Sequence, residues 1–377
     1  MRELTLVRPG RLAWRDRETP ALVDETDALV RPFIASRCDG DVVPLHRSGV
    51  SWQMKLGLRL GAIDPLVANI AGPTPFQGPF GIGHECVAQV TEVGAGVSGF
   101  SVGDVVIVPW AVSCGTCREC QLGITAKCAT FTAHSPGKVL SAYGFGPASG
   151  PWGGMVADTL RIPFADHMLV KVPTSIDPLR VAAASDNLTD AWRAVVPPLA
   201  QLPGGRVLVI GGGGQSIGLY AAGLAVAHGA EVDYVDNRQE RMAIADGFGA
   251  RVRGPAALEN LRNTYDVAVE ASSNEDRLAA AIRSLRPGGI CTGTGYYLRT
   301  STKLPVMDMY ATSATLNVGV SSVRPHLPAL LDFIATHGFP AEKVTTVLAN
   351  WDEAPEAYLA HTTKLVLQRE PLNLTNK

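Results

Sequence analysis

Four cysteines lie within fifteen residues in the first half of the chain, and this run limits the possible folds more than any other feature. They are Cys114, Cys117, Cys120 and Cys128, in the pattern C-x2-C-x2-C-x7-C. Four thiolates this close in sequence can close a tetrahedral zinc site with no open position, so the predicted site is structural. The nearest alternative is a [4Fe–4S] cluster, whose last two cysteines are separated by three residues and followed by proline. Here Ala129 follows Cys128, so the pattern favours a structural zinc lobe at about 112–130.

The other cysteines and the N-terminal residues bear on the cell compartment. Cys38, Cys86 and Cys291 stand alone, and the total of 7 is odd. The N-terminal stretch is charged throughout and lacks the apolar core of a signal peptide. An odd, clustered set of cysteines without a secretion signal favours metal ligation over disulfides. We therefore expect a cytoplasmic location.

Length and charge limit the number of domains and the class of partner. The chain has 377 residues, of which 46% are hydrophobic, and a formal net charge of −2. This length predicts two domains, and the near-neutral charge gives no electrostatic footprint for nucleic acid. The uncharged stretch Val207 to Ala230 is long enough to cross a bilayer, but the glycines Gly211 to Gly214 interrupt it. We expect a small-molecule substrate and neither a nucleic-acid nor a membrane partner.

Strand-like and helix-like segments alternate in the second half of the chain. The expected strands are 207–211, 231–235, 266–272 and 290–295, and the expected helices are 216–229, 238–249 and 275–289. Such alternation is typical of a parallel sheet with right-handed crossovers. The pattern predicts a doubly wound α/β domain.

A glycine-rich turn joins the first expected strand of this half to its first expected helix. Its spacing, Gly212-x-Gly214-x-x-x-Gly218, is one residue longer than G-x-G-x-x-G. Glycines let the backbone approach a pyrophosphate, whose charge is favoured by a helix N-terminus. The alternative is a flexible loop without a ligand. The residues predicted to bind the dinucleotide here are Gly212, Gly213, Gly214, Ser216, Ile217 and Gly218.

An acidic residue ends the next expected strand. Asp236 lies eighteen residues after Gly218. An acid at this place would accept hydrogen bonds from the adenosine ribose diol and repel a 2′-phosphate. Asp236 therefore favours NAD, whereas Arg238 could reach a 2′-phosphate and leaves NADP open.

The first part of the chain, to about residue 170, has a different pattern. Short β-like runs such as 87–93 and 104–109 are separated by turns that contain Gly and Pro. This pattern favours an antiparallel, barrel-like domain. The last part adds expected helices at 328–335 and 353–361 and an expected strand at 364–368.

The cysteine lobe, a Gly-His-Glu at 83–85 and the dinucleotide fold, in this order, carry a resemblance over nearly the whole chain. The chain resembles the zinc-dependent alcohol dehydrogenases of the medium-chain dehydrogenase/reductase family. The resemblance implies an α/β protein with a GroES-like antiparallel β catalytic domain, residues 1–187 and 325–377, and a Rossmann cofactor domain, residues 188–324. It also implies a homodimer or homotetramer through the edge of the cofactor sheet.

The resemblance further implies a second, catalytic zinc. Its ligands would be Cys38 of a C-x-x-D motif, His84 of the Gly-His-Glu, and Asp186 just before the cofactor domain. A cysteine, a histidine and a carboxylate suit zinc and leave a fourth position for water or a substrate oxygen. Taken singly, each residue has a structural alternative: a small buried side chain, a turn histidine and a helix cap.

The resemblance assigns supporting roles to five further residues. Asp41 would orient the ligand histidine, and Glu85 would be an acid close to the metal, able to act as an alternate ligand. Trp110 would form an aromatic wall of the substrate pocket, and Arg241 would assist at the adenosine ribose. Lys364 resembles the basic residue close to the metal-side glutamate.

The implied reaction is hydride transfer between an alcohol and NAD, with zinc as a Lewis acid. The reverse reaction would reduce an aldehyde or ketone. Two positions depart from the family. Gly40 stands where a Ser or Thr usually passes on the substrate's proton, and Asp39 stands where some members have an arginine on the pyrophosphate. The proton could instead move through water, Asp39, His46 or the ribose hydroxyl.

The missing hydroxyl at Gly40 also leaves a second function open. Relatives without the relay resemble reductases of activated C=C or C=N bonds. A redox-inactive binding protein is a third hypothesis, which the intact Cys38, His84 and Asp186 disfavour. The segment between Cys38 and His84 is longer than usual, and its extra residues, about 52–79, could cover a cleft, form a subunit contact or be a plain surface insertion.

Overall fold

The structure is a computed structural model, and it describes residues 1–132 and 138–373. The chain divides into two compact units. Unit 1 comprises Met1–Asp186, Ser322–His337 and Thr345–Lys377, and unit 2 comprises Asn187–Ser321 and Gly338–Val344. Residues 338–344, which the predicted limits give to the catalytic domain, thus pack with unit 2.

The described residues of unit 1 form two β-sheets. Its strands are β1 (Arg2–Arg8), β2 (Arg11–Asp16), β3 (Ala28–Ser36), β4 (Phe80–Gly81), β5 (Glu85–Val93), β6 (Val105–Ile107), β7 (Leu160–Ile162), β8 (Val170–Lys171), β15 (Val347–Asn350) and β16 (Leu365–Gln368). The smaller sheet has the order β2-β1-β4, and the larger has the order β15-β16-β3-β5-β6-β8, with β7 also paired to β3. All pairings of β3 are antiparallel. Side chains from both sheets share one hydrophobic core with Trp351 and Tyr358.

The two central strands of the larger sheet bring distant residues together. β3 and β5 are mostly buried and apolar, as expected for strands covered on both faces. Because they are antiparallel, the end of β3 lies beside the start of β5, and the register pairs Ser36 with Glu85. Cys38 follows β3 by two residues and His84 directly precedes β5. The sheet therefore places these two side chains at one edge.

Short helices complete unit 1. They are α1 (Val42–His46), α2 (Val50–Arg59), α3 (Leu66–Ala71), α4 (Arg118–Gln121), α5 (Ala129–Thr132), α6 (Ala165–Met168), α12 (Leu327–His337) and α13 (Ala354–Ala357). The 3-10 helices are η1 (Asp39–Asp41), η2 (Thr125–Lys127), η3 (Pro147–Ser149), η4 (Pro178–Val181) and η7 (Trp351–Glu353). The helix expected at 353–361 is thus shorter, because η7 precedes it and it ends at Ala357.

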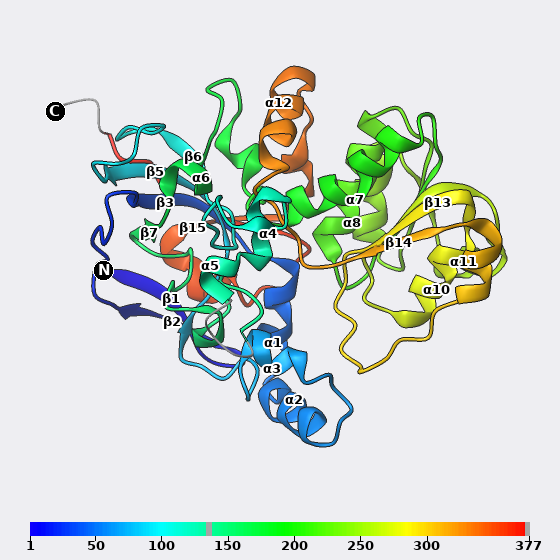
Figure 1. The fold of residues 1–377 in the computed structure, drawn as a ribbon, viewed down its shortest axis with the longest axis horizontal. Coiled ribbons are helices and arrows are strands. Elements are labelled where there is room, and N and C mark those ends of the chain that lie inside the picture. The colour runs from blue at the N-terminus through cyan, green and yellow to red at the C-terminus, as the bar shows by residue number, and fades with distance from the viewer. Residues whose placement is uncertain (133–137, 374–377) are drawn as a thin grey trace. The chain divides into compact units, whose positions relative to one another are not determined.

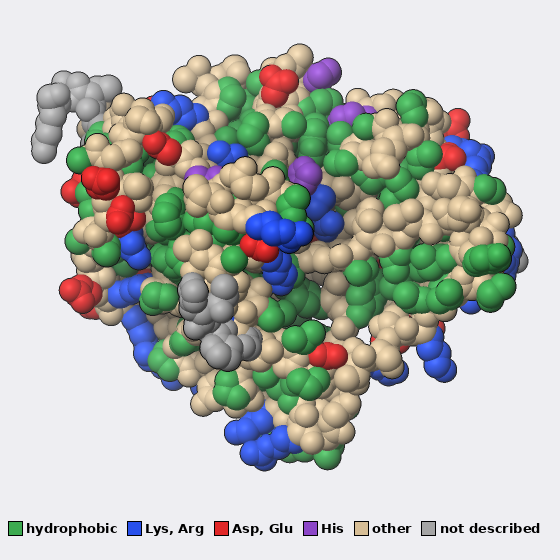
Figure 2. Space-filling view, in the orientation of Figure 1, with side chains coloured by type: hydrophobic (Ala, Val, Ile, Leu, Met, Phe, Trp, Pro, Cys, Tyr) green, Lys and Arg blue, Asp and Glu red, His purple; other side chains and the backbone are tan. Residues whose placement is uncertain are grey.

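The long segment between Cys38 and His84 folds into helices rather than an open loop. It contains α2 and α3, both labelled in Figure 1. Several of its apolar side chains are exposed, with Trp52 at 67% and Leu60 at 73%. Figure 2 shows hydrophobic and basic side chains together over this region. The segment therefore adds an apolar surface to unit 1.

Unit 2 contains one parallel sheet. Its strands are β9 (Val207–Ile210), β10 (Val232–Val235), β11 (Arg251–Arg253), β12 (Tyr265–Glu270), β13 (Leu285–Gly293) and β14 (Thr315–Val318). They have the order β11-β10-β9-β12-β13-β14, and every pairing is parallel. This order, with the chain reversing direction across the sheet at β9, is that of a doubly wound dinucleotide-binding sheet.

The helices of unit 2 cover both faces of its sheet. They are α7 (Asn187–Gln201), α8 (Gln215–Ala227), α9 (Gln239–Gly247), α10 (Glu275–Arg283) and α11 (Val306–Thr312), with 3-10 helices η5 (Pro255–Asn260) and η6 (Ala341–Val344). Figure 1 shows α7 and α8 on one side of the sheet and α10 and α11 on the other. No helix among the residues that the structure describes combines the length and apolar character needed to cross a bilayer.

One predicted boundary in unit 2 is wrong. The helix expected at 275–289 ends at Arg283, and β13 already begins at Leu285. Leu285 pairs with Tyr265 of β12, and a register irregularity follows before regular pairing resumes at Ile290. Strand pairing therefore overrides the helical pattern of this stretch, and the Pro-Gly-Gly lies inside the strand.

Candidate metal centres and dinucleotide site

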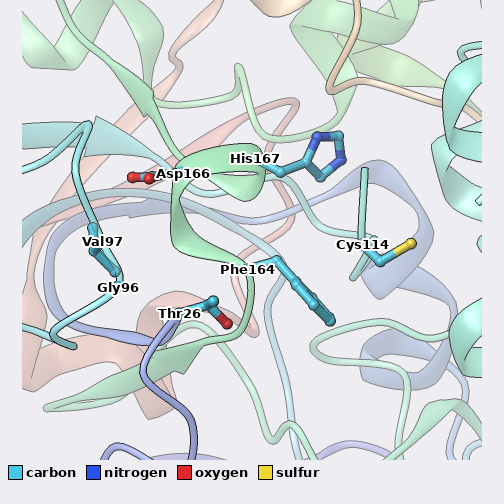
Figure 3. Close-up of a pocket in the computed structure, with 7 residues that line it drawn as sticks. All are labelled: Thr26, Gly96, Val97, Cys114, Phe164, Asp166 and His167. Atoms are coloured by element: carbon cyan, nitrogen blue, oxygen red, sulfur yellow. The ribbon is translucent and has the colours of Figure 1, made fainter. Parts of the chain in front are cut away.

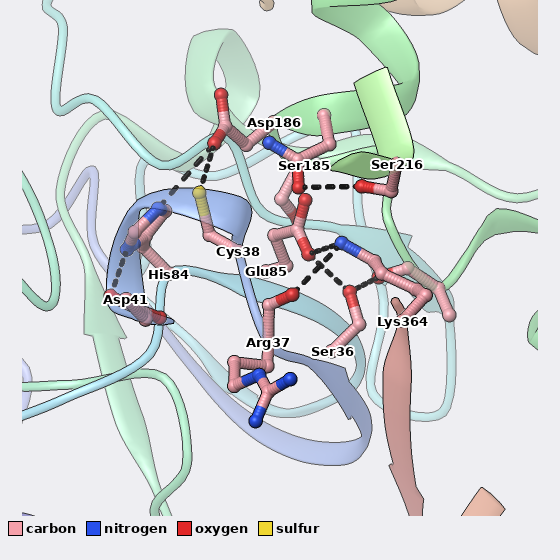
Figure 4. Close-up of polar contacts among 12 residues, drawn as sticks. Ser36, Arg37, Cys38, Asp41, His84, Glu85, Ser185, Asp186, Ser216 and Lys364 are labelled. Carbon is pink, nitrogen blue, oxygen red and sulfur yellow. Dashed lines mark hydrogen bonds and ion pairs between the residues drawn. The ribbon is translucent and has the colours of Figure 1, made fainter. Parts of the chain in front are cut away.

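The structure brings together the three dispersed residues that the resemblance assigns to a catalytic metal. The ligand atoms of Cys38, His84 and Asp186 all lie within 4.8 Å of one another. The Cys38 Sγ lies 3.1 Å from Asp186 Oδ2, and the His84 Nε2 lies 3.4 Å from the same oxygen. Figure 4 shows the three side chains pointing toward one another. They form one cluster, in which Cys38 and His84 are buried and Asp186 is partly buried, although they are far apart in sequence.

Local backbone geometry holds two of these residues. Cys38 is the N-cap of η1, and its sulfur accepts a hydrogen bond from the Gly40 N–H at 3.3 Å. Gly83, just before His84, has a φ of +92°, and a Cβ there would lie 2.9 Å from the Tyr358 hydroxyl. A side chain at this position would be strained and would clash, which explains the glycine of the Gly-His-Glu.

The donor atoms of this cluster fit a zinc ion. His84 is 2% exposed, and its ring nitrogens face the carboxylates of Asp41 and Asp186 without a well-formed hydrogen bond among the described residues. Burying polar atoms without hydrogen bonds costs free energy, and a metal would satisfy one nitrogen. A thiol, an imidazole and a carboxylate are ligands that zinc prefers. Asp41 Oδ1 lies 3.8 Å from His84 Nδ1, on the ring edge away from Asp186.

The electrostatics of the cluster are those of a cation site. Burial and the neighbouring Asp186 raise the pKa of the Cys38 thiol. Burial lowers the pKa of His84, but the carboxylates of Asp41 and Asp186 outweigh it and raise that pKa to about 9. Burial also opposes the charge of Asp186, yet His84 and Cys38 hold its pKa below its usual value. The positive charge of protonated His84 thus balances the negative charge of the carboxylates, as the charge of a bound metal ion would.

A buried ion pair lies behind the cluster. Glu85 Oε2 accepts hydrogen bonds from Lys364 Nζ, at 2.6 Å, and from the Ser36 hydroxyl. Both charged side chains are fully buried, and Lys364 also donates to the Arg37 carbonyl oxygen at 3.0 Å. Breaking such a pair leaves an uncompensated buried charge, which costs roughly 3–5 kcal/mol. Glu85, expected as an alternate metal ligand, is therefore engaged by Lys364 in this structure.

The sequence analysis did not predict two residues near the cluster, the buried Arg37 and the partly exposed Phe145. The Arg37 guanidinium donates to the carbonyl oxygens of Tyr358, Ala360 and Thr362, which ties this C-terminal segment to the end of β3. The ring of Phe145 lies 4.7 Å from that of His84. A charged residue at the end of an apolar strand was a usable signal for Arg37, whereas nothing in the sequence distinguishes Phe145.

Trp110, predicted to form an aromatic wall of the substrate pocket, lies close to the ligand histidine. Its ring centroid is 6.4 Å from that of His84 and 5.3 Å from that of Phe145. The two aromatic side chains therefore give one side of the cluster an apolar surface. His46, a candidate in the proton path, stacks on His361 at 3.9 Å and directs its Nε2 to the Leu359 carbonyl oxygen at 3.1 Å.

The four cysteines of the lobe converge as predicted from their spacing. Their sulfur atoms all lie within 4.8 Å of one another. The Cys114 sulfur accepts hydrogen bonds from the Thr130 hydroxyl at 3.0 Å and from the Thr116 and Cys117 N–H groups, both at 3.4 Å. Burial opposes the thiolate, but these donors outweigh it and lower the pKa of Cys114 to about 6. These donors thus favour one thiolate, whereas burial raises the pKa of two of the other cysteines.

A small cavity of about 180 Å³ borders the lobe. Its lining residues are Thr26, Gly96, Val97, Cys114, Phe164, Asp166 and His167 (Figure 3). Its two titratable side chains besides the cysteine are already engaged. Asp166 accepts hydrogen bonds from Ser98 and Gly99, and His167 Nε2 contacts the Ser113 hydroxyl at 3.0 Å. This cavity therefore adds no further ligand cluster.

In unit 2, the glycine turn lies between β9 and the N-terminus of α8. Gly212 has a φ of +156°, and a Cβ there would lie 2.6 Å from the Ser272 Cβ. The N–H groups of Gly213 and Gly214 donate to the carbonyl oxygens of Ser272, at 3.3 Å, and Ala271, at 2.6 Å. Glycine at Gly218 lets α8 pack closely on Gly211. The turn is therefore compact and tied to the loop that follows β12.

The other residues predicted at this site have definite partners. The Ser216 hydroxyl donates to Asn187 Oδ1 at 3.1 Å, and Ile217 is buried. Asp236 accepts five hydrogen bonds, from the Tyr234 hydroxyl, the Asn237 and Arg238 N–H groups, and Nε and Nη2 of Arg241. A carboxylate offers about four acceptor positions. A ribose hydroxyl would therefore have to replace one of these donors.

Known protein families match both halves of the chain. Residues 24–174 match the alcohol dehydrogenase GroES-like domain, and residues 216–336 match the zinc-binding dehydrogenase domain. A probable zinc-binding alcohol dehydrogenase of Mycobacterium tuberculosis is 29% identical over 296 residues, 76% of this chain and 72% of that protein. An alcohol dehydrogenase of Geobacillus stearothermophilus is 26% identical over 329 residues, 85% of this chain and 84% of that protein.

A solved structure has the same fold along the whole chain. The alcohol dehydrogenase from Thermus sp. ATN1 superposes with a TM-score of 0.80 at 27% identity, covering 98% of this chain and 99% of that chain. Together with the family matches, this similarity confirms the predicted α/β class, with a GroES-like domain and a Rossmann-type domain.

Proposed function

The chain belongs to the zinc-dependent alcohol dehydrogenases of the medium-chain dehydrogenase/reductase family, and we propose that it transfers a hydride between a small-molecule alcohol and NAD. The reverse reaction reduces an aldehyde or ketone. The observation that carries the proposal is the convergence of Cys38, His84 and Asp186 in one cluster. Three ligands leave a fourth position open, which a reacting oxygen needs and a structural site lacks.

Each of several residues of unit 1 would have its own role at this site. Zinc held by Cys38, His84 and Asp186 would supply Lewis-acid polarisation of the substrate oxygen. Asp41, on the Nδ1 side of His84, orients the imidazole so that Nε2 faces the other two ligands. The rings of Trp110 and Phe145 beside His84 would hold the carbon skeleton of the substrate and exclude water. The Cys114 lobe would hold a second, structural zinc.

In unit 2, the turn Gly212–Gly214 with Gly218, Ser216 and Ile217 would bind the pyrophosphate of NAD. Bound NAD would accept the hydride from the alcohol carbon, or NADH would return it. Asp236, held by Arg241, would keep negative charge near the adenosine ribose and disfavour a 2′-phosphate. NADP is the less favoured cofactor, and Arg238 is the residue that would admit it.

The test is turnover with a panel of primary and secondary alcohols and both cofactors, in the wild type and in His84→Ala. We expect reduction of NAD by the wild type and its loss in His84→Ala. His337→Gln is the matched control, because His337 is exposed on α12. Failure of every alcohol, with turnover of NADH on activated C=C or C=N bonds, would replace this proposal by the reductase. The absence of a side-chain hydroxyl at Gly40 is the observation that favours the reductase function.

We also propose that the protein is a homodimer or homotetramer in the cytoplasm. Closely spaced free thiols suit a reducing compartment. β14 is an edge strand, and α11 beside it exposes Met307 at 73% and Tyr310 at 81%. An unpaired edge with apolar neighbours favours edge-to-edge association. Sedimentation should show dissociation of Tyr310→Glu, whereas Val102→Glu, an exposed apolar residue of unit 1, should not change the oligomer.

A further inference from the structure

Arg277 reaches the glycine turn of unit 2 from a different part of the chain. It lies on α10, and its Nη1 donates a hydrogen bond to the Gly211 carbonyl oxygen at 3.1 Å. A Cβ placed on Gly212 would lie 3.4 Å from the same nitrogen. The guanidinium therefore lies against the turn that is proposed to bind a pyrophosphate.

The backbone fixes this position. The Asn274 side chain caps α10 by accepting a hydrogen bond from the Arg277 N–H at 3.0 Å, which places Arg277 in the first helical turn. The loop before α10 is joined to the glycine turn, because Gly213 and Gly214 donate to carbonyl oxygens of that loop. The approach of Arg277 to Gly211 thus follows from two linked loops rather than from one mobile side chain.

Arg277 differs from Arg241, the other arginine at this end of the sheet, in whether its charge is neutralised by a carboxylate. Arg241 is neutralised by two hydrogen bonds to the Asp236 carboxylate. Arg277 has no ion-pair partner among the described residues, and its side chain donates to a neutral carbonyl oxygen. A guanidinium has five N–H donors, so four remain beyond the bond to Gly211. Beside the positive end of α8, such a cation favours a phosphate.

We propose that Arg277 is a cofactor-positioning residue that binds a phosphate of the adenosine diphosphate moiety of the dinucleotide. The assignment rests on the proposed function, because it presupposes that the glycine turn binds a dinucleotide. Arg277 adds to that turn the full positive charge that backbone N–H groups and a helix terminus supply only in part.

The test measures binding rather than turnover. Full-length, zinc-loaded protein is titrated with NADH by fluorescence, and ADP and adenosine are used as competitors. We expect Arg277→Gln to weaken NADH and ADP roughly tenfold or more, as for the loss of a charge-assisted hydrogen bond, and to leave adenosine unchanged. Arg277→Lys should recover part of the loss, because it keeps the charge without the planar fork.

The matched control is Arg283→Gln, on the same helix, where the side chain pairs with Asp308 at the surface. It should bind all three probes as the wild type does. Unchanged NADH and ADP binding in Arg277→Gln would overturn the assignment. An equal loss of ADP and adenosine would overturn it too, because the arginine would then act only by shaping the turn. If the wild type binds no nicotinamide dinucleotide, the proposed function fails as well.

Discussion

The two cysteine-containing clusters of unit 1 use similar ligands but are built in opposite ways. The four-cysteine lobe lies within 15 residues, and its sulfur atoms accept hydrogen bonds from neighbouring N–H groups. The cluster of Cys38, His84 and Asp186 depends on the register of β3 and β5 and on the buried pair of Glu85 and Lys364. A local cluster needs its metal to fold, whereas a dispersed cluster exists because the surrounding fold has formed. Loss of a ligand should therefore cost stability in the first and activity in the second.

The largest expected effect is on the lobe. Cys120→Ala removes one of four thiolates from a short segment whose fold depends on them, and structural zinc contributes on the order of 10 kcal/mol. We expect loss of one zinc per chain and a fall of several kcal/mol in the free energy of unfolding. Elemental analysis and denaturant unfolding measure both.

The control for this variant is Cys86→Ala. Cys86 is also buried, on β5, but belongs to neither cluster. It should keep its zinc and lose about 1 kcal/mol, as for a small side chain removed from a core. A Cys120→Ala protein that retains its zinc and its stability would show that the lobe is not a zinc site.

The next largest effect is on activity at the dispersed cluster. Cys38→Ala should lose the other zinc and, with it, Lewis-acid assistance worth several kcal/mol, or roughly a thousandfold in kcat/KM. Its unfolding midpoint should stay near that of Cys86→Ala, because β3 and β5 still pair. A strongly destabilised but active Cys38→Ala protein would contradict the conclusion that this cluster serves activity rather than stability.

The difference between the clusters also explains what the sequence could predict. Spacing alone predicts the lobe and the glycine turn, because their residues are neighbours along the chain. The dispersed cluster was predicted only from a family resemblance, because Cys38 and Asp186 are far apart in sequence and share no motif. Contacts that depend on packing, such as those of Phe145 and Arg277, were missed. The helix predicted over 275–289 was too long for a similar reason, because Leu285 pairs with β12 as part of a strand.

A smaller effect concerns the pH dependence of zinc loading. Zinc binds a neutral imidazole and a thiolate, so binding at the dispersed cluster must remove the proton from His84, whose pKa is about 9, and from Cys38, whose pKa is raised. Zinc binding there should therefore strengthen as the pH rises toward 9 and weaken as it falls. In the lobe, Cys114 has a pKa of about 6, but burial raises the pKa of Cys120 and of Cys128, so zinc binding there also releases protons.

The measurement compares two variants that each keep one cluster. Cys120→Ala reports the dispersed cluster and Cys38→Ala reports the lobe, at a fixed free zinc concentration. Between about pH 8 and about pH 6, the zinc content of the dispersed cluster should fall. A zinc content of the dispersed cluster that stays constant over this range would contradict the pKa shifts of His84 and Cys38.

The smallest expected effect concerns Gly40, two residues after Cys38. This residue lacks the hydroxyl that would pass on the substrate's proton. A Cβ at Gly40 would meet only the Cys38 sulfur, at 3.8 Å, so a serine fits there without strain. If proton transfer limits turnover, Gly40→Ser should raise kcat a few-fold, because a hydroxyl can pass the substrate's proton outward. Gly40→Ala adds the same Cβ without the hydroxyl and should not. Equal rates for the two variants, with an unchanged solvent isotope effect, would show that the proton leaves by another path.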